Sequence, residues 1–231
     1  MNLSTLFRTK ENLNLDKNTL TIFRYIAIIG QFFAITVVYF YLKLSFPINQ
    51  SYLIIFFGLV TNLYLQFGIK INQLKDFYAA PFLLYDLLQL SLLLYLTGGI
   101  FNPFSFLLVI PAIVSSTFLS MGTTIILVLI TSMLLLVLSI FYLPLPGIDL
   151  MKFPEIYKIG IFVSILIGLI FLSYFGIRFA GEKKKTEEAF KKLQEVIYKE
   201  YELESLGGQA AAAAHSLGTP LATTLIVASG V

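Results

Sequence analysis

Long apolar stretches alternate with short polar segments from the N-terminus to about residue 180. A helix that crosses a membrane needs roughly 20 mainly apolar residues, and six segments of the sequence come close to that requirement. They cover 23–42, 52–69, 79–97, 104–120, 123–143 and 157–179. The pattern therefore predicts an all-α membrane protein, with a six-helix domain over 23–179 that follows a polar tail over 1–22.

The fourth and fifth apolar segments are separated only by the neighbourhood of Met121, Gly122 and Thr123. Together they are far too long for one crossing of the membrane. We therefore expect these two segments to form a tight helical hairpin.

A different pattern begins after the sixth apolar segment. Residues 182–206 contain neither Pro nor Gly and are rich in strong helix formers. Phe190, Leu193, Ile197 and Tyr201 recur at three- and four-residue steps and give one apolar stripe among charges. Such a stripe forms either a coiled-coil seam or a helix lying on the membrane surface. The mixed signs of the charges favour a coiled-coil linker over 180–205.

The composition agrees with a membrane protein. The chain is 58% hydrophobic and 13% charged, whereas about a quarter of the residues of a soluble domain are charged. It contains no cysteine, which excludes disulfides, thiolate metal sites and thiol redox switches within these residues. We expect no metal site.

The distribution of lysine and arginine predicts the orientation, because these residues are enriched in cytoplasmic loops. On one side of the predicted membrane lie the tail, the loop after the second segment and the region after the sixth. The basic residues on that side are Arg8, Lys10, Lys17, Arg24, Lys70, Lys75, Arg178, Lys183, Lys184 and Lys185. This asymmetry predicts that both termini are cytoplasmic, as an even number of spans requires.

The single histidine lies in "AAAAAHSLGTPL", residues 210–221. We expect the helix to pause at Gly207 and Gly208, and Pro220 to bend it one turn after His215. A neutral, exposed imidazole is a competent nucleophile for a phosphoryl group, and the Thr219 hydroxyl can orient a water molecule towards a phosphorylated ring. The alternative is a histidine that only fills the surface or the core.

This stretch resembles the phosphoacceptor box of sensor histidine kinases, H-E/D-x-x-T/N-P-L. His215, Thr219, Pro220 and Leu221 match the box. The resemblance implies that His215 is the phosphoacceptor and that 206–231 begins a dimerisation and histidine-phosphotransfer hairpin. Ser216 replaces the acidic residue that assists proton transfer, so the implied kinase step is weakened or absent.

The second informative stretch is "TGGIFNPFSF", residues 97–106. One interpretation is a tight turn between two helices. The other is a ligand site, because the glycines allow a flat ligand to approach the backbone and the Asn102 side chain can hydrogen-bond a carbonyl group. Such a site would suit a quinone head group.

Residues 98–104 match GGxxNPF, the heptapeptide of the RegB/PrrB family of redox-responsive sensor histidine kinases. The chain resembles this family in its six spans, its linker and its alanine-rich histidine box. The resemblance implies quinone sensing, with Gly98, Gly99, Asn102, Pro103 and Phe104 as the sensing residues.

Asp86 and Gln89 lie three residues apart within the third apolar segment. Ionisable groups in membrane helices are unfavourable and tend to face the interior of the bundle. The pair is either part of a ligand or proton site, or it forms structural hydrogen bonds with Gln31, Asn62 or Gln66.

No ATP-binding motif follows in the sequence, so we expect a truncated stretch that cannot phosphorylate itself. The leading hypothesis is a bacterial inner-membrane sensor histidine kinase that reads the quinone pool. Its partners would be a second copy of the chain, ATP on a separate domain and a response regulator, with no direct binding of nucleic acid. The rival hypotheses are a non-catalytic membrane receptor or scaffold and a small transporter.

Overall fold

The computed structural model describes residues 15–144 and 154–228, with side chains described as far as Ala214. Nearly all of these residues are helical. The chain divides into two units, Met1–Gly181 and Glu182–Val231.

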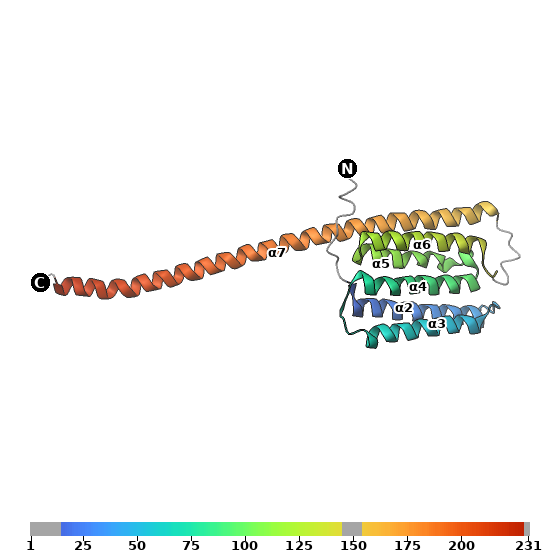
Figure 1. Cartoon of the computed structure of the whole chain (residues 1–231), viewed down its shortest axis with the longest axis horizontal. Helices are drawn as coiled ribbons and strands as arrows, with labels where there is room; N and C mark the ends of the chain where they lie inside the picture. Colours follow the sequence, from blue (N-terminus) through green and yellow to red (C-terminus); the bar gives the residue numbers. More distant parts are fainter. Residues whose placement is uncertain (1–14, 145–153, 229–231) are drawn as a thin grey trace. The chain divides into compact units, whose positions relative to one another are not determined.

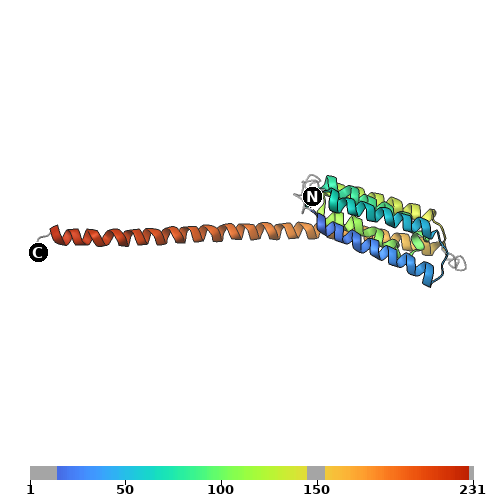
Figure 2. The ribbon, with the colours of Figure 1, turned by 90° about the horizontal axis from the view of Figure 1, so that it is seen from below.

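The first unit is a bundle of helices that lie side by side (Figures 1 and 2). Two π-helical turns, η1 (Val37–Tyr41) and η2 (Tyr64–Gly68), extend α2 and α3. Helix α4 contacts α3, α5 and α6, and α2 packs against α3. The α-helices are α2 (Lys17–Thr36), α3 (Ile48–Leu63), α4 (Asp76–Leu96), α5 (Ile110–Phe118), α6 (Met121–Ile140) and the first part of α7 (Glu155–Ala228).

Helix α2 begins at Lys17, earlier than the expected residue 23. The Asp16 carboxylate caps it by accepting a hydrogen bond from the Thr19 backbone N–H at 3.0 Å. A short antiparallel pair, β1 (Leu15–Asp16) with β2 (Gln73–Leu74), ties the start of α2 to the start of α4. Counting Lys17 and Arg24 among the charges of the tail is therefore wrong, because both lie on α2, Lys17 at its first residue and Arg24 about two turns later.

Among the described residues, five helices are long and apolar enough to cross a membrane. The segment predicted at 104–120 is a shorter apolar helix, Pro103–Phe118. It consists of a 3-10 helix, η4 (Pro103–Val109), followed by α5. Because a 3-10 helix rises about 2.0 Å per residue and an α-helix about 1.5 Å, the segment reaches roughly 27 Å, close to the ~30 Å of a bilayer core. The count of six crossings stays a prediction.

Helices α5 and α6 form the predicted hairpin and pack against each other. The Ser120 hydroxyl caps α6 by accepting from the Thr123 backbone N–H at 3.3 Å. The Asp76 carboxylate, at the start of α4, accepts from the Ser120 backbone N–H at 2.9 Å. Within the hairpin, the hydroxyl oxygens of Ser115 and Thr124 lie 3.0 Å apart.

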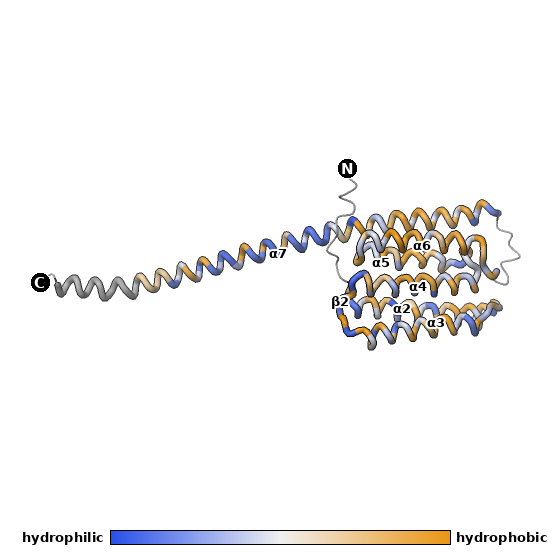
Figure 3. Tube along the Cα trace, in the orientation of Figure 1, coloured by the Kyte–Doolittle hydropathy of each residue, from blue (hydrophilic) through white to orange (hydrophobic). Residues whose placement is uncertain are grey.

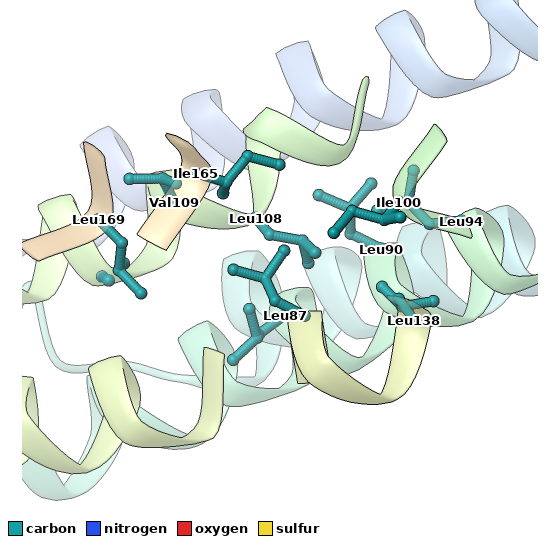
Figure 4. Close-up of a cluster of buried hydrophobic side chains, with 11 residues drawn as sticks. Leu87, Leu90, Leu94, Ile100, Leu108, Val109, Leu138, Ile165 and Leu169 are labelled. Atoms are coloured by element: carbon teal, nitrogen blue, oxygen red, sulfur yellow. The ribbon is translucent and has the colours of Figure 1, made fainter. Parts of the chain in front are cut away.

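The largest apolar core lies between α4, the loop after it, α5, α6 and α7 (Figure 4). We call these residues the central cluster: Leu87, Leu90, Leu94, Ile100, Leu108, Val109, Ala112, Leu135, Leu138, Ile165 and Leu169. Smaller clusters join α2 and α3 to α4, one of them around Ile35, Ile55 and Leu93.

In the second unit, α7 continues as helix as far as Ala228. The expected pause at Gly207 and Gly208 is therefore wrong. Glycine in a helix is less favourable than alanine by about 1 kcal/mol, and the alanines and glutamates around this pair favour the helix. Polar residues predominate over 182–206, in contrast to the first part of α7 (Figure 3). The residues of the predicted stripe, Phe190, Leu193, Ile197 and Tyr201, are exposed.

Candidate functional site

The two glycines of the 97–106 loop have conformations that favour glycine. Gly98 has φ 106° and Gly99 φ 59°, both in the left-handed region. A Cβ atom on Gly99 would collide with the side chain of Tyr142 and the carbonyl oxygen of Leu138. The small size of Gly99 thus serves the packing of the loop against the end of α6.

Asn102 is 9% exposed and organises the loop from within. Its side-chain Nδ2 donates to both the carbonyl oxygen and the hydroxyl oxygen of Thr97, each at 2.8 Å. Its Oδ1 accepts from the Phe104 backbone N–H at 2.9 Å and so caps η4, in which Pro103 occupies the first turn. In this arrangement Asn102 has no amide hydrogen left for the carbonyl of a ligand.

The other side-chain donors of the loop are also engaged. The Thr97 hydroxyl donates to the Leu93 carbonyl at 2.7 Å, and the Ser105 hydroxyl donates to the Ile100 carbonyl at 3.2 Å. Phe104 and Phe106, by contrast, are largely exposed. The loop therefore leaves two aromatic side chains exposed, while its described side-chain donors hold the turn together.

The loop and the start of α7 contribute to the same buried cluster. Ile100, on the short 3-10 helix η3 (Gly99–Phe101), is 1% exposed and belongs to the central cluster. Ile165 and Leu169 of α7 belong to the same cluster (Figure 4). Because buried side chains are closely packed, a change in the position of Ile100 can reach α7 through the other residues of the central cluster.

A second group of polar residues lies between α2, α3 and α4. The Nε of Arg24 donates to the two carboxylate oxygens of Asp86 at 2.8 and 3.1 Å. Its Nη2 donates to the Thr61 hydroxyl at 2.9 Å. The guanidinium carbon lies 5.2 and 5.7 Å from the ring centroids of Phe82 and Tyr85. The side chain of Arg24 is 3% exposed and that of Asp86 24% exposed.

Gln89 forms the structural hydrogen bond that one of the two interpretations expected. Its Nε2 donates to Gln31 Oε1 on α2 at 3.1 Å. The side chain lies tightly against Gly58 of α3, where a Cβ atom would overlap it. Asp86 instead pairs with Arg24, a partner that the sequence analysis missed. The sequence contains a signal for the position of Arg24 but not for its partner, because Asp16 is a helix-capping residue that precedes the apolar run and places Arg24 inside the helix.

Helix α2 makes further polar contacts along its length, which together we call the α2 polar seam. The Tyr25 hydroxyl donates to Gln66 Oε1 at 2.6 Å, and the hydroxyl oxygens of Thr36 and Tyr52 lie 3.0 Å apart. Asn62 Nδ2 donates to the Thr21 carbonyl at 3.2 Å. With the Arg24–Asp86, Arg24–Thr61 and Gln31–Gln89 contacts, these bonds join α2 to both α3 and α4.

The residues of the predicted phosphoacceptor box belong to helix α7. The side chains of His215, Ser216, Thr219 and Pro220 are outside the described residues, so the predicted exposure of the imidazole stays a prediction. Among the residues that are described, no group of three His, Cys, Asp or Glu side chains is arranged to hold a metal ion.

Comparison with curated proteins gives one consistent result. The chain is 38% identical over 214 residues to the protein named Sensor histidine kinase RegB from Cereibacter sphaeroides, and the match covers 91% of the chain and 46% of that relative. The same values are found for RegB of strain ATCC 17023 of that species. The chain thus spans about half the length of the curated relatives it matches. No protein-family model and no solved structure matches the chain.

Proposed function

Because the chain belongs to the RegB/PrrB family of sensor histidine kinases, we propose that it is the membrane sensor and phosphoacceptor part of a kinase in a two-component system. Three features support this proposal. They are the identity over most of the chain, the GGxxNPF match at 98–104 and the histidine box at 210–221, in the order expected for the family.

In the proposed reaction, a nitrogen of the His215 imidazole attacks the γ-phosphorus of ATP. A bond forms between that nitrogen and phosphorus, the bond to the bridging oxygen breaks, and ADP leaves. ATP is held by a separate domain, and the phosphoryl group then passes to an aspartate of a response regulator. Pro220 bends the helix beside His215, and the Thr219 hydroxyl orients the water that later hydrolyses the phosphoimidazole.

The observation that carries the proposal is that the candidate sensing loop and the helix that bears the histidine contribute to the same buried cluster. Ile100 of the loop and Ile165 and Leu169 of α7 belong to one buried cluster, and α7 continues as helix to Ala228. A ligand that changes the position of the loop would therefore shift or rotate α7. The exposed stripe at 190–201 gives a second copy a surface through which that movement can alter a dimer seam.

We further propose that the ligand is a quinone and that its head group binds at the loop of Gly98, Gly99, Asn102, Pro103 and Phe104. Gly98, Gly99 and Asn102 would hold the shape of the loop, and the exposed rings of Phe104 and Phe106 would contact the head group. The protein would lie in the bacterial inner membrane, cross it six times and have both termini in the cytoplasm.

The kinase proposal is tested by fusing an ATP-binding domain of a sensor histidine kinase after Val231 and adding radiolabelled ATP to the fusion protein in vesicles. We expect acid-labile labelling of the parent protein and complete loss of label in His215→Gln. In Thr219→Ala we expect the label to form and to decay more slowly. Equal labelling of His215→Gln and the parent would overturn the assignment of the phosphoacceptor.

The quinone site is tested with two phenylalanine variants that lie in different parts of the bundle. Phe104→Leu removes an exposed ring from the loop, whereas Phe67→Leu removes an exposed ring from η2. We expect binding of a short-chain ubiquinone to the protein in nanodiscs to weaken about tenfold in Phe104→Leu and to stay unchanged in Phe67→Leu. Equal affinity in both variants would mean that the loop is only a turn.

The receptor hypothesis rests on Ser216, which occupies the position of the acidic residue. In the fusion protein, Ser216→Glu is expected to increase the initial rate of labelling. No increase, together with no labelling of the parent, would favour a receptor without kinase activity.

A further inference from the structure

Three buried side-chain atoms have no hydrogen-bond partner among the described residues: Arg24 Nη1, Asn62 Oδ1 and, on α7, Ser173 Oγ. Arg24 Nη1 can only donate a hydrogen bond, whereas Asn62 Oδ1 can only accept one. Both of these side chains are buried, because Arg24 is 3% and Asn62 0% exposed. Arg24 and Asn62 thus leave one donor and one acceptor without a partner.

These two side chains belong to the same contact between α2 and α3. Arg24 Nη2 donates to the hydroxyl of Thr61, the residue next to Asn62, at 2.9 Å. Asn62 Nδ2 donates in the opposite direction, to the carbonyl of Thr21, which lies about one turn before Arg24, at 3.2 Å. Each side chain therefore has one end fixed across the helix contact and leaves one polar atom unpaired.

Surrounding lipid tails cannot supply the lacking partners. Arg24 is seven residues after the start of α2, or roughly 10 Å along the helix from Lys17. Lipid tails neither donate nor accept hydrogen bonds, so unpaired groups within a helix that crosses the membrane are strongly unfavourable. The Asp86 carboxylate accepts from Nε, and the Thr61 hydroxyl accepts from Nη2.

We propose that this contact is a binding site for a hydroxyl group that accepts a hydrogen bond from Arg24 Nη1 and donates one to Asn62 Oδ1. A hydroxyl meets both requirements because its oxygen accepts while its hydrogen is donated. Water carries such a group, and so does a quinol dissolved in the membrane. A quinone carbonyl can accept from Arg24 but cannot donate to Asn62, so the site discriminates between the reduced and the oxidised form.

The site is separate from the loop at 98–104 and does not depend on phosphorylation of His215. The described groups around Arg24 are the Asp86 carboxylate, the Thr61 hydroxyl, the ring of Phe82 and the ring and hydroxyl of Tyr85. The 24% exposure of Asp86 marks the side from which the ion pair can be reached.

The site is tested on the whole chain in lipid nanodiscs by nuclear magnetic resonance of ¹⁵N-labelled arginine. The chain has three arginines, Arg8, Arg24 and Arg178, and Arg24→Lys identifies the buried one. We expect the Nη1 protons of Arg24 to show magnetisation transfer to a bound hydroxyl. The sample is then measured with a short-chain ubiquinol and, separately, with the matching ubiquinone.

Transfer from water that neither compound alters supports the proposal with water as the carrier. Loss of the water transfer on addition of ubiquinol, but not of ubiquinone, supports it with quinol as the carrier. The proposal is overturned if no transfer is seen and neither compound shifts the Arg24 signals. It is also overturned if both compounds shift these signals equally.

Variants of Asn62 assign the second partner. Asn62→Leu removes the acceptor, and we expect it to abolish the water transfer or to weaken ubiquinol binding about tenfold. Asn62→Asp keeps an acceptor oxygen and is expected to retain the signal. Gln31→Leu, on the same face of α2 but engaged with Gln89, is the matched control and is expected to leave the signal unchanged. Circular dichroism confirms folding, and if Asn62→Leu does not fold, the parent protein and Asn62→Asp decide the question.

Discussion

Helix α2 meets its neighbours through hydrogen-bonding side chains as well as through small apolar clusters, whereas α4, α5, α6 and the start of α7 meet around the larger apolar central cluster. The α2 polar seam includes the Arg24–Asp86 pair and the Gln31–Gln89 bond. The central cluster contains no polar side chain. One sequence thus uses two different ways of joining helices within one bundle.

The difference matters because the bilayer removes much of the hydrophobic driving force between helices. Apolar surfaces are as well solvated by lipid tails as by each other, so close packing holds the α4–α7 group, together with a few hydrogen bonds such as that from Ser120 to Asp76. Hydrogen bonds and the ion pair fix which residues of α2 face α3 and α4. We infer that the α2 polar seam fixes the position of α2, while the central cluster carries movement from the loop to α7.

The largest effect is expected at the buried ion pair. Asp86→Leu leaves the Arg24 guanidinium charged and unpaired, and we expect it to lower the free energy of unfolding by about 3–5 kcal/mol. Arg24→Leu/Asp86→Leu removes both charges and should lose much less. Reversible unfolding in mixed detergent micelles measures both values. Losses below about 1 kcal/mol for Asp86→Leu would show that the seam does not hold α2.

Gly99 tests the packing of the other group. Gly99→Ala places a Cβ against Tyr142 and the Leu138 carbonyl at a positive φ, and we expect a loss of roughly 2–3 kcal/mol from strain and overpacking. Gly122, at the start of α6, has open space where a Cβ would lie. Gly122→Ala is therefore the matched control and is expected to be neutral or slightly stabilising. Equal effects of the two substitutions in the same unfolding assay would contradict this description of the loop.

Asn102 tests whether polar bonds also matter within the apolar group. Asn102→Ala removes the cap of η4 and the two bonds to Thr97, and we expect it to lower the free energy of unfolding by about 1–2 kcal/mol. Asn18 on α2 is exposed, and Asn18→Ala should change stability by less than about 0.5 kcal/mol. If Asn102→Ala leaves the free energy of unfolding unchanged, Asn102 does not stabilise the loop, and a direct role in ligand binding is favoured.

The smallest effect is expected at the neutral pair of the seam. Gln31→Leu removes one hydrogen bond to Gln89, and such bonds between membrane helices contribute about 0.6 kcal/mol on average. A double-mutant cycle of Gln31→Leu and Gln89→Leu, in the same assay as the Asp86 variants, gives the coupling energy. If the coupling energy between Gln31 and Gln89 is as large as that between Arg24 and Asp86, charged and neutral contacts of the seam do not differ in strength.

The sequence predicted the helices well because a bilayer imposes long apolar runs. The hairpin before residue 121 followed from the same requirement of length. Arg24 was misplaced because a basic residue near the start of an apolar run was assigned to the cytoplasmic side, whereas an ion pair with Asp86 makes its burial possible. A sequence shows charges but not which helices face each other, so the partner on α4 could not be identified.

The loop shows a second limit. The Asn102–Pro103 pair correctly indicated the start of a helix, since asparagine caps and proline suits the first turn. Asn102 was also expected to bind a ligand carbonyl. The sequence could not show that both side-chain amide hydrogens of Asn102 are donated to Thr97. Gly207 and Gly208 were expected to interrupt a helix, but the strong helix formers around them prevail.

The central claim is that the membrane bundle controls phosphorylation of His215 in response to the quinone pool. Its most direct test is the initial rate of His215 labelling in the ATP-binding-domain fusion, measured in vesicles that contain either oxidised or reduced ubiquinone. The account predicts rates that differ between the two conditions and become equal when Ile100→Ala weakens the central cluster that the loop and α7 share. Equal rates in the parent protein under both conditions would contradict it.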